Sequence, residues 1–337
     1  MKLIFMGTAS FAVPILKNIL KNKNKFDLVA VFTKPDSLEG RGLKKAESPI
    51  KKYLLANEKI IFQQGSGKRL KNQISLFQPK NFRESENLAI LKKLNPDLII
   101  VAAYGIILPP EVLAIPHFGC LNIHPSWLPK YRGPSPIQAT ILNQESETAV
   151  TIIKLNSQVD TGDIVAQQKI KMPISITAPQ LNNKLAKLGG ELLIKTLPNY
   201  LAGKIKLRKQ TDFNQLTPSY TKIINKKNGL IGWNQPAKKI EAQIRALKPW
   251  PGTYTFFKLP KKQEELRIDI ISAKALPYSK KINPGQVFID TEKFSQPAVA
   301  TAKGVLVLDK IKPAGKKEMS AIDFVNGHPD FIGTILG

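Results

Sequence analysis

The chain has 337 residues, of which 42% are hydrophobic and 23% are charged, and its formal net charge is +26 at pH 7. This length predicts about two domains, and the apolar fraction is high enough for a buried core, so the composition excludes a disordered protein. A single cysteine, Cys120, excludes an intrachain disulfide and is typical of a protein in a reducing compartment such as the cytoplasm.

Hydropathy and charge further narrow the class of protein to which the chain can belong. No stretch approaches the roughly 20 apolar residues of a membrane-spanning helix, and the apolar run at residues 3–6 breaks at Gly7, without the cleavage site of a signal peptide. We therefore expect a cytoplasmic protein with no membrane partner. The positive charge favours a polyanionic partner, and nucleic acid is the commonest one in that compartment. A general lysine-rich composition is the alternative explanation of the charge.

The first two hundred residues predict alternating strands and helices. Continuous apolar strands are expected at residues 2–6, 27–33, 98–102 and 119–123. Helical signals lie at residues 11–20, 48–49, 84–94 and 177–201. This alternation, with strands that are apolar on both faces, predicts an α/β fold with a Rossmann-like, mostly parallel open sheet. No G-x-G-x-x-G follows the first strand, so neither a nicotinamide nor a flavin cofactor is expected.

The remaining sequence changes character. Residues 204–221 lack a clear periodicity and carry several basic side chains, which is typical of a linker. Short β-rich runs separated by Pro, Gly and Lys turns then predict a small β-barrel, at residues 253–257, 266–271, 286–289 and 304–308. We therefore predict a first domain at residues 1–203, a linker at 204–221 and a second domain at 222–337.

The second part of the chain is the more basic. Residues 204–337 carry as much net positive charge as residues 1–203, although the segment is one-third shorter. A barrel with this charge is a candidate surface for an RNA backbone. The alternative is a lysine-rich face that contacts only water.

Polar residues follow the strand predicted at residues 119–123. Asn122 and His124 are two residues apart, so their side chains leave the same face of the strand. Pro125 ends the strand and places His124 at a carboxyl edge, where open α/β sheets bind ligands. A second loop at residues 160–163, Asp-Thr-Gly-Asp, follows a β-rich run and contributes carboxylates beside a glycine.

An amide, an imidazole and a carboxylate are the groups that acyl transfer to an amine requires. A histidine moves protons near neutral pH, and an asparagine amide can donate to the oxyanion, an interaction worth about 10²–10³ in rate. An aspartate can hold the histidine in one tautomer, stabilise its cation or help to deprotonate the amine. From the residues alone we infer an acyl- or group-transfer enzyme, and purely structural roles for these side chains stay open.

Two other chemistries are not expected. Cys120 has no partner base in the sequence, so we interpret it as a small buried hydrophobic residue rather than a catalytic thiol. The chain has three histidines, and they show no close metal-ligand spacing, so no metal is expected.

The segment at residues 119–138, Gly-Cys-Leu-Asn-Ile-His-Pro-Ser-Trp-Leu-Pro-Lys-Tyr-Arg-Gly-Pro-Ser-Pro-Ile-Gln, resembles the N-x-H-x-S-L-L-P segment of the methionyl-tRNA formyltransferase family. Trp127 stands where that family has a leucine. Residues 160–163 are similar to the family's second active-site loop. Further similar motifs occur towards both ends, at residues 7–12, 31–42, 102–109, 244–251 and 313–317, so the resemblance covers most of the chain.

The resemblance implies a Rossmann-like formyltransferase domain followed by a small OB-like β-barrel domain that helps to bind tRNA. The formyl donor would be 10-formyltetrahydrofolate, the acceptor would be charged initiator tRNA, no metal would be needed, and we expect a monomer. The family's catalytic positions fall on Asn122, His124 and Asp160. Its folate-contacting stretch falls on Ser126, Trp127, Leu128 and Pro129, and its tRNA-binding arginine falls on Arg41.

Two features depart from the family pattern, and two other functions stay open. Residues 65–77 form a longer, basic insertion, and Ala149 stands where a glycine is usual. A formyltransferase for an amino sugar or a nucleotide-sugar would use the same three groups, and the chain could instead be a non-catalytic RNA-binding protein. The basic linker, the basic barrel and Arg41 favour tRNA as the acceptor.

Overall fold

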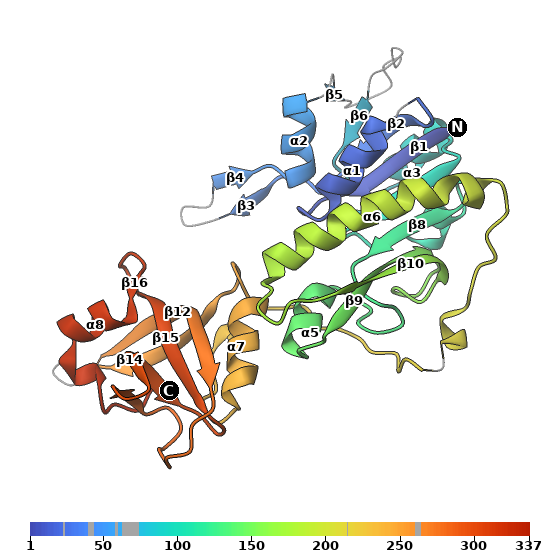
Figure 1. The fold of residues 1–337 in the computed structure, drawn as a ribbon. Coiled ribbons are helices and arrows are strands. Elements are labelled where there is room, and N and C mark those ends of the chain that lie inside the picture. Colours follow the sequence, from blue (N-terminus) through green and yellow to red (C-terminus); the bar gives the residue numbers. More distant parts are fainter. Residues whose placement is uncertain (23, 40–43, 58–59, 63–73, 214, 260–263) are drawn as a thin grey trace. The chain divides into compact units, whose positions relative to one another are not determined.

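The computed structural model describes residues 1–337 except 23, 40–43, 58–59, 63–73, 214 and 260–263 (Figure 1). The chain forms two compact units. The N-terminal unit contains residues 1–136, 147–171 and 181–221, and the C-terminal unit contains residues 137–146, 172–180 and 222–337. Among the described helices, none combines the length and the apolar character that crossing a membrane would require.

The N-terminal unit is built on an eight-stranded sheet with the order β10-β9-β8-β7-β1-β2-β6-β5. Its strands are β1 Lys2–Gly7, β2 Asp27–Phe32, β5 Ile60–Phe62, β6 Ile74–Phe77, β7 Leu98–Ala102, β8 Cys120–His124, β9 Glu147–Lys154 and β10 Asp163–Lys171. The strands β8-β7-β1-β2-β6-β5 each pair in parallel with their neighbours in this order. β9 pairs antiparallel with β8, and β10 pairs antiparallel with β9. The predicted Rossmann-like, mostly parallel sheet is confirmed.

Helices cover both faces of this sheet, which explains the continuous apolar strands. They are α1 Ala12–Lys21, α2 Pro49–Asn57, α3 Ser85–Leu94, α4 Pro110–Leu113 and α6 Ala178–Leu201. Leu91 of α3 and Val112 of α4 share a core with Ile4 on one face. On the other face α6 packs so closely that a Cβ on Gly189 would lie 2.8 Å from a methyl group of Ile123.

A short hairpin departs from the sequence predictions. β3 Ser37–Glu39 and β4 Lys44–Ala46 pair antiparallel and form a two-stranded sheet of their own. Strands of three residues are too short to give a periodic pattern. The hairpin flanks residues 40–43, so Arg41 lies outside the described residues, as does most of the insertion at 65–77.

The C-terminal unit contains an antiparallel six-stranded sheet with the path β11-β12-β15-β14-β13 and with β16 beside β15. Its strands are β11 Thr253–Lys258, β12 Glu265–Leu276, β13 Val287–Asp290, β14 Phe294–Ala300, β15 Val305–Pro313 and β16 Met319–Ser320. The chain also forms α5 Pro136–Leu142, α7 Ala237–Ala246 and α8 Ala321–Gly327. The sheet forms a half-barrel round the larger of its core clusters, which confirms the predicted small OB-like domain.

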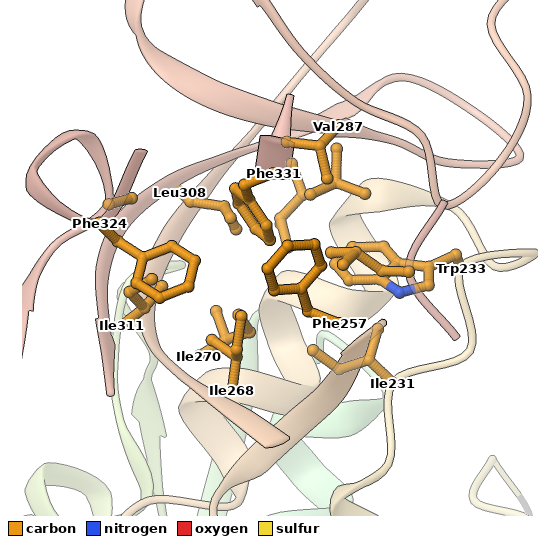
Figure 2. Packing of buried hydrophobic residues seen from close by; sticks show 14 of the residues in the cluster. Ile231, Trp233, Phe257, Ile268, Ile270, Val287, Leu308, Ile311, Phe324 and Phe331 are labelled. Carbon is orange, nitrogen blue, oxygen red and sulfur yellow. The ribbon is translucent and has the colours of Figure 1, made fainter. Parts of the chain in front are cut away.

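The core of the C-terminal unit gathers around Phe257, which is fully buried (Figure 2). Its ring meets those of Phe331 and Phe324 edge-on, with centroids 5.1 and 6.2 Å away. Such edge-to-face pairs stabilise a core beyond the area they bury. A buried hydrogen bond also lies beside this core. The indole Nε1 of Trp233 donates it to Oγ1 of the buried Thr255 over 3.1 Å.

Thr255→Val should lower the free energy of unfolding by about 1–3 kcal/mol, because a side chain of nearly the same shape leaves the buried indole N–H without an acceptor. Denaturant unfolding of the wild type and the variant measures this change. As a control, Trp233→Phe removes the donor, so Thr255→Val should cost less in that background than in the wild type. Equal costs in both backgrounds would show that the bond does not contribute.

Candidate active site

Three polar side chains meet where β8 ends. Asn122 and His124 leave one face of β8, and Asp160 lies in the turn between β9 and β10. The amide Nδ2 of Asn122 donates to Oδ1 of Asp160 over 3.3 Å, and Nδ1 of His124 lies 3.6 Å from Oδ2 of the same carboxylate. The structure therefore brings together the three residues that the sequence singled out.

His124 is held in one orientation by the main chain. The residue is only 4% exposed, and its Nε2 lies 2.9 Å from the carbonyl oxygen of Tyr131. A carbonyl can only accept, so in the neutral ring the proton resides on Nε2 and the lone pair is on Nδ1. Nδ1 is therefore the ring atom that can take up a proton, and it faces Asp160.

The turn that carries Asp160 has an uncommon backbone conformation. Asp160 has a φ of +53°, in the left-handed region where Asp and Asn are the non-glycine residues most often found. Its Oδ2 accepts a hydrogen bond of 2.8 Å from the main-chain N–H of Gly133. Two residues on, a Cβ at Gly162 would collide with the carbonyl oxygen of Lys154. The turn is thus pressed against β9, and its carboxylate is fixed from two sides.

The loop after β8 is fastened to the β9–β10 hairpin by polar side chains. Thr151 on β9 donates to the carbonyl of Ser126 over 2.7 Å, and Gln167 on β10 donates to the carbonyl of Leu128 over 2.8 Å. Ser126, Leu128 and Pro129 are buried, whereas Trp127 is partly exposed. Of the four residues predicted to contact folate, Trp127 therefore offers the largest open surface.

A lysine lies over the partly exposed indole of Trp127. Nζ of Lys169 on β10 is 3.4 Å from the centroid of the Trp127 ring, and it is also 3.8 Å from a carboxylate oxygen of Glu147. A cation over an indole face is attracted by the electrons of the ring. A partly exposed indole and a positive charge thus lie together beside the loop after β8.

A segment from the predicted linker also contributes to the site. Residues 208–213 and 215–221, here called the strap, belong to the N-terminal unit. Within the strap Gln210 donates to the carbonyls of Asp160 and Gly162, at 2.8 and 2.9 Å, and accepts from the guanidinium of Arg132. Sequence reasoning missed Gln210, because a single amide in an aperiodic segment leaves no pattern to detect.

Cys120 opens β8 and is 1% exposed, which confirms the prediction of a small buried residue. Burial raises the pKa of its thiol to about 12. A thiol with such a pKa stays protonated at neutral pH, and the thiolate is the reactive form. The structure therefore offers no activated thiol at this position.

Iodoacetamide should accordingly alkylate native Cys120 at least about 10²-fold more slowly than free cysteine at pH 8, because only a minute fraction of the thiol is ionised there. Mass spectrometry of protein quenched at intervals gives the rate. Full labelling after unfolding in denaturant is the control. Rapid labelling of the folded protein would contradict the burial.

The chain matches known families over most of its length. Residues 1–197 match the family Formyl transferase, and residues 223–329 match Formyl transferase, C-terminal domain. The methionyl-tRNA formyltransferase of Caldanaerobacter subterraneus subsp. tengcongensis is 37% identical over 337 residues, with all of both chains covered. That of Clostridium tetani is 38% identical, with 100% of this chain and 99% of the relative covered.

Solved structures share the fold. An N-formyltransferase from Helicobacter canadensis, in complex with folinic acid and dTDP-3-aminofucose, has a TM-score of 0.60 at 23% identity, covering 91% of this chain and 99% of the other. The methionyl-tRNA formyltransferase of Clostridium thermocellum has a TM-score of 0.52 at 19% identity, covering 81% and 93%. Because these relatives are 37% and 38% identical to it over its full length, the chain belongs to the methionyl-tRNA formyltransferase family.

Proposed function

We propose that the chain transfers the formyl group of 10-formyltetrahydrofolate to the α-amino group of methionyl-initiator tRNA in the cytoplasm, giving N-formylmethionyl-tRNA for translation initiation. One observation carries the proposal: Asn122, His124 and Asp160 converge at the end of β8, in a chain that belongs to the methionyl-tRNA formyltransferase family. The family's folate-derived donors and the aminoacyl-tRNA acceptor supply the two substrates.

The reaction is a direct acyl transfer. The neutral amine attacks the formyl carbon, so a new C–N bond forms while the carbonyl oxygen becomes an oxyanion. The bond from that carbon to N10 of the folate then breaks, and N10 takes a proton as the amine loses one. An amine is a good nucleophile without further activation, so the protein's task is to stabilise the oxyanion and to move one proton.

The geometry suits these two tasks. The amide nitrogen of Asn122 carries two N–H bonds, and the contact of one with Asp160 leaves the other to donate to the carbonyl oxygen of the formyl group. Nδ1 of His124 can receive the proton of the attacking amine, and the positive charge then lies 3.6 Å from the Asp160 carboxylate. The same nitrogen can return that proton to N10 as the folate leaves.

Trp127 and Lys169 support the choice of a folate as the donor. The indole of Trp127 is partly exposed, and Lys169 over its ring adds a positive charge that suits the carboxylates of a folate. Ser126, Leu128 and Pro129 are buried, so in this proposal they shape the loop that presents Trp127.

The net charge of +26 and Arg41 support tRNA as the acceptor. The affinity for charged tRNA should fall linearly with salt on logarithmic axes, by about 0.7–0.9 per phosphate contacted. Arg41→Ala should weaken productive tRNA binding and leave folate binding unchanged. Filter binding at several salt concentrations measures the tRNA affinity of the wild type and of the variant, and a separate titration with the folate measures its binding. A flat salt response would argue against a surface that follows the RNA backbone.

Formyl transfer by the purified protein tests the proposal directly. Charged initiator tRNA, charged elongator tRNA and an amino nucleotide-sugar are offered separately with 10-formyltetrahydrofolate. We expect rapid formylation of the initiator tRNA and slow reaction of the other two acceptors. Formylation of the sugar but not of the tRNA would replace the proposal by a sugar formyltransferase, and binding of tRNA without turnover would indicate an RNA-binding protein.

A further inference from the structure

The strap joins the two loops that carry the proposed reaction. Its main chain pairs with the loop after β8, where Arg132 donates to the carbonyl of Ser219 over 2.8 Å and accepts from the N–H of Thr221 over the same distance. Near its start, Arg208 exchanges two main-chain hydrogen bonds with Ile164 of β10. The strap thus bridges the loop that follows His124 and the strand that follows Asp160.

The side chain of Gln210 adds hydrogen bonds to both segments that the strap bridges. It is 5% exposed, and both ends of its amide are engaged. Its Oε1 accepts from Nε and Nη2 of Arg132, at 3.0 and 2.8 Å, while its Nε2 donates to the carbonyls of Asp160 and Gly162. One neutral group therefore ties the loop after β8 to the turn after β9.

Asp160 depends on such support. Its left-handed backbone is less favourable than an extended or helical one, and it persists only where the surroundings impose it. The contacts of its carboxylate reach Asn122, His124 and Gly133, so a rotation of the Asp160 peptide would disturb all three. Gln210 holds the carbonyl of that same peptide unit.

We propose that Gln210 is a positioning residue for formyl transfer, which acts by fixing the Asp160 turn relative to the loop that holds His124. This inference rests on the proposed function. Arg132 completes the link, because its guanidinium approaches the amide oxygen with two donors and thereby orients the amide nitrogen towards the turn. The strap is thus part of the catalytic apparatus as well as a connection to the C-terminal unit.

Gln210→Glu tests the inference, because the substitution keeps the acceptor for Arg132 but points a carboxylate oxygen at two carbonyl oxygens. We expect kcat to fall by about 10²-fold, as for a misplaced catalytic group. The KM values for the folate and for charged tRNA should change by less than about threefold, since the proposed contacts to both substrates remain. The measurement is steady-state formylation of charged initiator tRNA.

Gln243→Glu is the matched control. The Gln243 amide also donates to two carbonyls, those of Asn228 and Leu230 at 2.8 and 3.2 Å, but it lies in the C-terminal unit. Its kcat should stay within about twofold of the wild type. A similar loss of kcat in both variants would assign the effect to general destabilisation and overturn the inference.

A second comparison separates positioning from folding. If Gln210 acts through Asp160, adding Gln210→Glu to Asp160→Asn should slow the reaction by less than about twofold beyond Asp160→Asn alone. Losses that multiply would overturn the inference. Gln210→Met, which has a similar length without polar ends, should show the same fall in kcat. Failure of both Gln210 variants to fold would assign Gln210 to stability instead.

The wild-type reaction keeps the two proposals apart. A wild type that formylates no charged tRNA would refute the proposed function. An active wild type whose Gln210→Glu variant has the same kcat would refute the positioning role alone.

Discussion

His124→Ala should lower the turnover number for formylation by about 10²-fold or more and leave the affinity for tRNA close to that of the wild type. The imidazole is the group to which the proposal assigns the proton transfer beside Asn122 and Asp160, and its removal leaves that transfer to water. The residue is 4% exposed and its ring is hydrogen-bonded to the Tyr131 carbonyl, so little of it is available for a broad RNA surface. Single-turnover formylation and tRNA binding measure the two quantities separately.

His117→Ala provides the matched control, because His117 is exposed and its ring contacts that of Phe118. Its turnover should stay within about twofold of the wild type. Unchanged formylation by His124→Ala would refute the role assigned to His124. A loss of tRNA affinity equal to the loss of turnover would instead place this residue in substrate binding.

The second large effect is expected for Asp160→Asn, with a loss of about 10²–10⁴-fold in turnover. Asparagine tolerates the left-handed backbone at this position and has the same shape, so the variant should keep its fold. It lacks the negative charge that stabilises a proton on Nδ1 of His124, 3.6 Å away. It also puts an amide where two N–H groups now converge on carboxylate oxygens.

Asp163→Asn is the control, since Asp163 comes from the same Asp-Thr-Gly-Asp loop and opens β10. Turnover of this variant should change little, because neither of the contacts to Asn122 and Gly133 involves Asp163. Equal losses from both substitutions would show that the loop as a whole matters rather than the carboxylate of Asp160. The pair therefore decides between the two carboxylates that the sequence offered.

Much of the N-terminal sheet could be predicted because burial on both faces leaves unbroken apolar runs. The run at residues 98–102 became β7, and the helical spacing at 84–94 became α3. The second domain was harder to predict. β14 contains Pro297, which interrupts a strand pattern, and the seven-residue helix α8 is too short for a clear helical period. The curvature of the C-terminal sheet likewise depends on contacts between strands that are distant in the sequence, and no local sequence pattern indicates such contacts.

The candidate site was predictable to different degrees. Asn122 and His124 followed from the alternation of side chains along a strand that ends at Pro125. Asp160 was chosen over Asp163 only through the resemblance to a family. Four residues do not determine the conformation of a turn, so they do not show which carboxylate faces the site. Nothing in the sequence indicated Gln210, whose four hydrogen bonds join loops far apart in the chain.

The late place of the strap in the chain has a consequence for biosynthesis. A nascent polypeptide that has just emerged through α6 contains every strand of the N-terminal sheet but lacks Gln210, Ser219 and Thr221. About twenty further residues have to emerge before the strap can pair with β10 and with the loop after β8. With the positioning role proposed for Gln210, full catalytic activity has to wait until the chain has been made through Thr221, at the border of the C-terminal unit.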